Sequence, residues 1–171
     1  MNNTMTFMKY IKTESGMLAR VETTCRAPLN VQLDQDSEMD LKPGTRCELD
    51  IRGYSGDFRL FQYEGDLYEY AGEKYDIHST EVVKPVGTYI PPKGWSVDNS
   101  WQKPTIVFSG VVQDGIYYSS AAEDKPNYSL AVKTFDMVFD LKLRYDGKVR
   151  IGDYVCGQAW LYATMKHKEK K

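Results

Sequence analysis

The sequence holds few of the residues that build covalent or metal-centred sites. Its three cysteines, Cys25, Cys47 and Cys156, are an odd number, and none of them belongs to a Cys-x-x-Cys pair. Its two histidines, His78 and His167, stand at no metal-ligand spacing from a cysteine. We therefore expect no disulfide framework, no bound metal and no cofactor. Free thiols indicate a reducing, cytoplasmic setting, and apolar neighbours predict that all three cysteine side chains are buried.

Signals for membrane insertion and for catalysis are also scarce. No apolar run approaches the roughly 20 residues that span a bilayer, and no charged-then-apolar leader opens the chain. The 13 glycines are dispersed instead of clustered before a helix, and no Gly-x-Ser-x-Gly elbow is present. The acidic segment 34–40 lacks the mid-loop glycine of a calcium loop. We predict no catalytic residue, no membrane contact and a protein that is not an enzyme.

What the sequence does hold is aromatic residues, including 13 tyrosines, which favour β-strands. The clearest strand is predicted at 135–145, where apolar residues alternate with polar ones at the two-residue period of a strand with one wet face. No stretch of a dozen residues carries a convincing helical stripe. At most, segment 4–13 is a short helix, and it fits a strand equally well. Further strands are expected at 17–25, 29–34, 46–54, 58–63, 66–71, 105–112 and 115–120.

The Asp146-Gly147 pair predicts a hairpin after the strand at 135–145. A two-residue loop would place apolar and charged residues on the same face. A three-residue loop, with Gly147 in the left-handed position of a bulge, instead places Leu143 beside Val149. We therefore predict the bulged hairpin.

In segment 151–162, "IGDYVCGQAWLY", a strand would place Trp160 and Leu161 on opposite faces, so one of the two faces the core. Simple alternation from the preceding hairpin would leave Trp160 outside, but it would bury Asp153. A turn or bulge at Gly152-Asp153 reverses every later side chain and avoids an unpaired buried carboxylate. We therefore predict that Trp160 points inward.

The segment "TIVFSGVV" followed by "IGDYVCGQAWLY" resembles the opening and closing strands of a small Greek-key barrel, a likeness that covers the second half. This resemblance concerns the fold and transfers no role to any residue, because such barrels host many functions. The predicted fold class is all-β: small Greek-key barrels or a sandwich, OB-like in the second half, with two similar halves. We expect an N-terminal β half at 1–83, a Pro/Trp-rich crossover or linker at 84–104, a C-terminal β half at 105–165 and a basic tail at 166–171.

The crossover holds four of the seven prolines and two of the three tryptophans, and long connections that retain tryptophan are usually functional. Lysines alternate with these rings, as on surfaces that stack a ligand. The alternative is that both tryptophans plug the end of a barrel, since each buries roughly 150 to 250 Å². The predicted binding residues are Tyr89, Lys93, Trp95, Trp101 and Lys103.

These observations leave three hypotheses for function. The first is a non-catalytic binding or assembly module that contacts a protein partner or a second copy of itself. The second is a single-stranded nucleic-acid-binding protein of the OB type, ranked lower because a formal net charge of -2 gives no overall attraction for phosphates. The third is an enzyme whose site is assembled from dispersed carboxylates and tyrosines.

Overall fold

A computed structural model describes residues 2–86, 94 and 102–168 and confirms an all-β fold. The described residues form nine strands, which belong to one sheet, and one helix. In chain order these elements are β1 (Asn2–Thr13), β2 (Gly16–Glu22), β3 (Pro28–Leu33), β4 (Arg46–Phe61), α1 (Glu64–Tyr75), β5 (Val82–Val86), β6 (Thr105–Tyr117), β7 (Tyr128–Lys133), β8 (Val138–Leu143) and β9 (Tyr154–His167).

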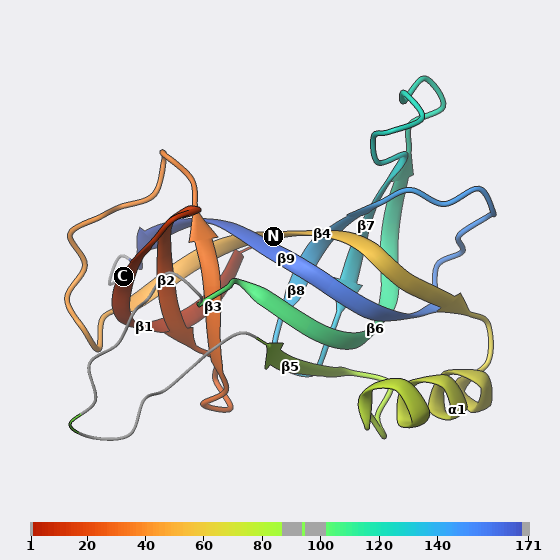
Figure 1. The fold of residues 1–171 in the computed structure, drawn as a ribbon, viewed down its shortest axis with the longest axis horizontal. Coiled ribbons are helices and arrows are strands. Elements are labelled where there is room, and N and C mark those ends of the chain that lie inside the picture. The colour runs from red at the N-terminus through yellow and green to blue at the C-terminus, as the bar shows by residue number, and fades with distance from the viewer. Residues whose placement is uncertain (1, 87–93, 95–101, 169–171) are drawn as a thin grey trace.

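The sheet closes into two rings that share their two longest strands. Strands β1, β2, β3, β9 and β4 form the first ring, which closes where β4 pairs with β1. Strands β6, β7, β8, β4 and β9 form the second, which closes where β9 pairs with β6. Figure 1 shows β4 and β9 crossing the molecule between β1–β3 on one side and β6–β8 on the other. The two long strands therefore run through both rings and connect them.

The two rings have the same pairing pattern, as the expectation of two similar halves requires. Each has three successive antiparallel strands, and the third strand of each pairs in parallel with the long strand of the other half. The OB-type assignment of the second half stays a prediction, as does the division at residues 83, 104 and 165. Strand β5 includes residues 84–86, the first part of the predicted crossover, and pairs with β6.

One continuous apolar core fills both rings, because inward side chains of β4 and β9 contribute to each. In β8 every second residue is buried, which is the alternation that the sequence predicts there. Phe108 and Phe139 meet in this core edge to face, with ring centroids 5.3 Å apart. A smaller cluster under α1 joins Leu67 and Ala71 to Cys156. Cys47 and Cys156 are buried as expected, whereas Cys25 is exposed, so the prediction for that residue was wrong.

The predicted strand at 66–71 is wrong, because these residues lie in α1. Leu67 and Ala71, four residues apart, are the buried residues of this helix. Acidic residues occupy the first turn and Lys74 the last, as the helix dipole favours. The helix ends at Asp76 in the left-handed conformation. With twelve residues, α1 is too short to cross a membrane, and no other helix occurs in the described ranges.

Several predicted breaks between strands are irregularities within longer strands. Segment 4–13 is a strand, and segments 46–54 and 58–63 largely merge into β4. The pairing of β4 with β9 shifts register between Tyr54 and Asp57, where the gap between the two predicted strands lies. Strand β6 likewise continues through 113–115 with a register shift. Such bulges bend a strand without ending it, which lets β4 leave one ring and enter the other.

The predicted hairpin at Asp146-Gly147 is wrong. Strand β8 is present, but β7 pairs with one of its edges and β4 with the other. Residues 148–151 therefore have no edge of β8 to pair with and form a loop instead. The turn signal at Asp146-Gly147 produces no hairpin, because two other strands pair with both edges of β8.

The predicted inward orientation of Trp160 is also wrong. Val155, Ala159 and Leu161 are buried, and Trp160 is half-buried on the opposite face of β9. Asp153 is buried too, but the backbone N–H of Arg150 donates to its carboxylate at 2.8 Å. Because this carboxylate has a partner, its burial carries a smaller penalty than we assumed and the alternation is not reversed.

Candidate functional site

Of the five predicted binding residues, the structure describes only Lys103. Its side chain is exposed shortly before β6 begins. Tyr89, Lys93, Trp95 and Trp101 lie outside the described residues, so their predicted role stays a prediction. The described part of the chain offers two other surfaces with the chemistry of a binding site, one where the rings join and one at the far end of the second ring.

The first surface, which we call the junction surface, is the outer face of β4 and β9. Tyr54 lies opposite Trp160 in the antiparallel pairing, and Arg52 lies opposite Tyr162. Ile51, Leu161 and Ala163, their neighbours along the strands, point the other way, into the core. Alternation within β4 and β9 therefore brings three aromatic rings and a guanidinium together on the outside.

The rings of the junction surface contact one another in sequence. Tyr54 and Tyr162 meet edge to face with centroids 5.4 Å apart, and Tyr162 and Trp160 follow at 6.5 Å. The indole N–H of Trp160 donates to Gln32 at 2.9 Å, which fixes its ring. Asp34, Arg52, Tyr54 and Tyr162 line a hollow of about 310 Å³ here. This volume is at the lower end of the range for small-molecule sites.

A hydrogen-bonded ion pair forms one wall of this hollow. Arg52 Nη2 lies 2.8 Å from Asp34 Oδ2, which also accepts a short hydrogen bond from Thr164. Asp34 Oδ1 accepts from the backbone N–H of Asp36 and from Ser37. Burial raises the pKa of Asp34, but the hydrogen bonds from Thr164 and Arg52 outweigh it and lower the pKa overall. The Asp34 carboxylate is therefore ionised at neutral pH.

The second surface, which we call the end hollow, has a volume of about 350 Å³. Its apolar lining includes Val112 and Leu130, which are almost fully buried, and the rings of Tyr117 and Tyr128, 5.0 Å apart. Across from β6 it is lined by residues 148–151. The hollow therefore lies between the last residues of β6 and the loop that precedes β9.

The edge of β6 beside the end hollow is unpaired. Strand β9 pairs with Thr105–Val111, and two backbone hydrogen bonds between Val112 and residues 152–153 extend that pairing by one residue. Beyond it, Asp114–Tyr117 pair with β7 alone among the described residues. Asp114 accepts from the backbone N–H of Gly115 at 2.8 Å, which shields one donor of this edge.

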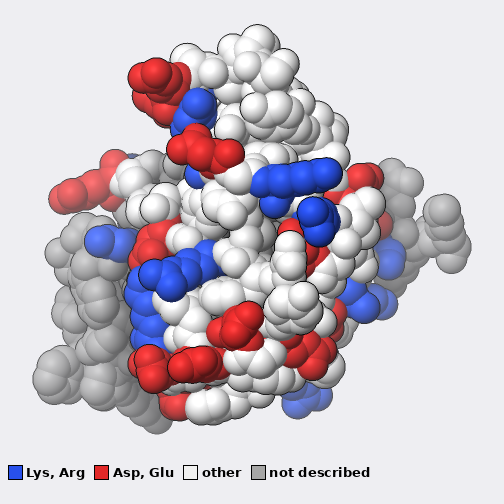
Figure 2. Space-filling model, turned by 90° about the vertical axis from the view of Figure 1, so that its right-hand side faces the viewer, with Lys and Arg blue, Asp and Glu red and all other residues white. Residues whose placement is uncertain are grey.

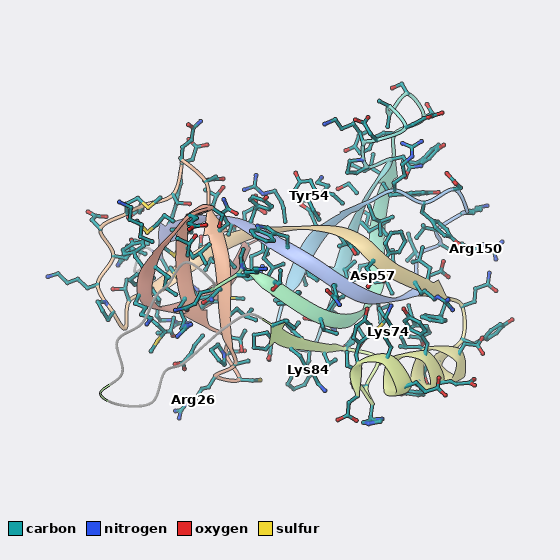
Figure 3. All side chains as sticks on the ribbon, in the orientation of Figure 1. Arg26, Tyr54, Asp57, Lys74, Lys84 and Arg150 are labelled. Carbon is teal, nitrogen blue, oxygen red and sulfur yellow. The ribbon has the colours of Figure 1, made fainter. Side chains whose placement is uncertain are left out.

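Exposed apolar side chains gather at this end of the second ring. Ile116 and Tyr117 are each 58% exposed, Tyr118 is 43% exposed and Ile151 is 74% exposed. Lys148 and Arg150 are exposed on the loop beside them. Figure 3 places Arg150 at the far end of the second ring, well away from Tyr54. In Figure 2 this end of the molecule shows basic and acidic side chains close together with uncharged surface between them.

Within the part of the chain that the structure describes, no three His, Cys, Asp or Glu side chains gather in a geometry that could hold a metal ion. His78 Nε2 lies 2.8 Å from Asp76 Oδ1, and both side chains are largely exposed. Comparisons with protein-family models, with curated proteins and with solved structures found no match to this chain.

The sequence contains a signal for the junction surface. In β4 and β9, tyrosine and tryptophan occupy the polar phase of an otherwise regular alternation, which places them outside. The end hollow was harder to predict, because it forms where β6 continues beyond the residues that pair with β9.

Proposed function

We propose that this protein is a non-catalytic binding module that contacts a partner protein at the end hollow. One observation carries the proposal: exposed Tyr117 and Ile151 line the end hollow beside a strand edge that has no partner in the described structure. Exposed tyrosine and isoleucine side chains that form one patch mark interaction surfaces more often than single exposed residues do.

The expected mode of binding is strand addition. An extended segment would pair with the free edge of β6 at Tyr117 and, once the Asp114 side chain releases the backbone N–H, at Gly115, and its side chains would alternate between the end hollow and solvent. Main-chain hydrogen bonds would supply much of the affinity. Lys148 and Arg150 would favour acidic side chains in the bound segment, because two positive charges face one carboxylate, that of Asp114.

A designed peptide tests this function directly. The probe is a fluorescein-labelled peptide in which valine alternates with glutamate, and the comparison peptide carries lysine in place of glutamate. Fluorescence polarisation should detect the acidic peptide and not the basic one. Truncation of Tyr117 to alanine should weaken binding about fivefold or more, the loss typical of an interface anchor. Phe135→Ala is the matched control, since Phe135 is 70% exposed outside the hollow.

Sedimentation equilibrium of the unlabelled protein distinguishes a foreign partner from a second copy. Self-association that Tyr117→Ala abolishes and Phe135→Ala preserves would support the same surface with another copy of the chain as its occupant. A monomer at all concentrations that binds neither peptide would contradict the proposed function.

A further inference from the structure

The junction surface is independent of the end hollow and has a different chemistry. Its three rings lie on the solvent side of β4 and β9, and Tyr54 is 46% exposed although it contacts Tyr162. By strand register, Lys142 of β8, Tyr54 of β4 and Trp160 of β9 form one row across three adjacent strands. Adjacent strands lie about 4.8 Å apart, so this row is about 10 Å long. A row of this length accommodates about two stacked rings of a ligand.

The polar groups of the junction surface favour a ligand that accepts hydrogen bonds. Both oxygens of Asp34 already accept two hydrogen bonds each, which leaves this carboxylate little capacity for a ligand. Arg52, in contrast, keeps donors, because its hydrogen bonds to Asp34 and Thr164 both come from Nη2 and its side chain is 32% exposed. Sugar hydroxyls need acceptors as well as donors. Nucleobases present flat faces and edges rich in carbonyl oxygens and ring nitrogens, and they fit this site better.

The charge of the junction surface sets how such a ligand would be held. Lys142 and Arg52 are positive, whereas Asp34 and Asp140 are negative, and Asp140 lies opposite Arg52 in the β4–β8 pairing. The four charges cancel, so a phosphate backbone gains little net attraction here. Stacking would therefore supply most of the affinity, and Lys142, opposite Tyr54, is placed to contact a phosphate.

We propose that the junction surface binds single-stranded nucleic acid by stacking bases on Tyr54 and Tyr162, with Arg52 donating to a base edge. Asp34 acts as a positioning residue that holds the Arg52 guanidinium. Binding is tolerant of sequence, because every base has a face to stack. It depends only weakly on salt: one phosphate contact, from Lys142, predicts a slope of about -0.7 in log K against log salt concentration.

Fluorescence polarisation with the full chain and a labelled oligothymidylate of about 15 nucleotides tests the proposal. Tyr162→Ala and Tyr54→Ala should each weaken binding between about 5-fold and about 150-fold, the range reported for loss of one stacked base. Tyr162→Phe keeps the ring and should retain wild-type affinity, which separates loss of stacking from loss of fold. Tyr63→Ala is the matched control, since Tyr63 is 69% exposed immediately before α1.

Salt dependence provides the second measurement. Between about 50 and 200 mM salt, Lys142→Gln should make the slope shallower by about 0.7, the value of one single-strand phosphate contact. A wild-type slope steeper than about -3 would assign binding to a more basic surface and overturn the proposal. No binding at low ionic strength would also overturn it, as would tighter binding of neutral oligosaccharides with the same sensitivity to Tyr162→Ala.

Discussion

Replacement of Gly157 by alanine tests how closely β4 and β9 pack where the two rings meet. A Cβ at Gly157 would lie 2.3 Å from the carbonyl oxygen of Asp57 and 2.7 Å from the Cα of Phe58. Both are backbone atoms of β4, which move only if the shared ladder shifts. Overpacking of this kind destabilises by about 3 kcal/mol at its upper range, and alanine in place of glycine in a strand regains about 0.5 to 1 kcal/mol. A net loss of about 2 kcal/mol follows.

Thermal unfolding followed by circular dichroism measures this loss. For a chain of this length, about 2 kcal/mol lowers the melting temperature by about 4 to 8 °C. The matched variant is Gly56→Ala, because a Cβ at Gly56, in the bulge of β4, would meet nothing within 4 Å. Its stability should stay within about 0.5 kcal/mol of wild type. Equal melting temperatures for the two variants would refute the inferred packing of β4 against β9.

Three further outcomes follow from buried and hydrogen-bonded groups. Because the folded pKa of Asp34 is lowered, its contribution to stability is present above about pH 4 and is lost at lower pH, so Asp34→Asn should flatten acid unfolding monitored by fluorescence. Burial raises the pKa of Cys47 and Cys156 to about 11, so a thiol reagent at pH 8 should label only the exposed Cys25 until denaturant is added. Phe139→Ala should lower the free energy of unfolding by about 3 to 5 kcal/mol in urea titrations, since Phe139 is 1% exposed.

The sequence predicted strands correctly where the alternation of apolar residues determines the structure, as in β8. It gave a wrong prediction where distant strands pair with the same strand edge. Asp146-Gly147 is a strong hairpin signal, yet β4 and β7 take both edges of β8 and leave residues 148–151 without a partner. No local pattern indicates that competition. The all-β class was accessible because aromatic and β-branched residues alternate over most of the chain.

Orientation errors arose from an incomplete account of polar groups. We rejected an outward Trp160 because it required a buried Asp153, but a backbone donor three residues earlier satisfies that carboxylate. The helix α1 was missed because Tyr68 and Tyr70 give segment 66–71 the aromatic content typical of a strand. The spacing of four between Leu67 and Ala71 was the signal for a helix.

The sharing of β4 and β9 also determines when this protein can fold. Strand β9, the last strand in the chain order, supplies pairing partners to β3, β4 and β6. A nascent chain that has emerged only as far as β8 therefore lacks the fifth strand of either ring and exposes the apolar faces of both. Contacts between such distant segments also slow the search for the native state. Both rings therefore close together once β9 is available, instead of one after the other.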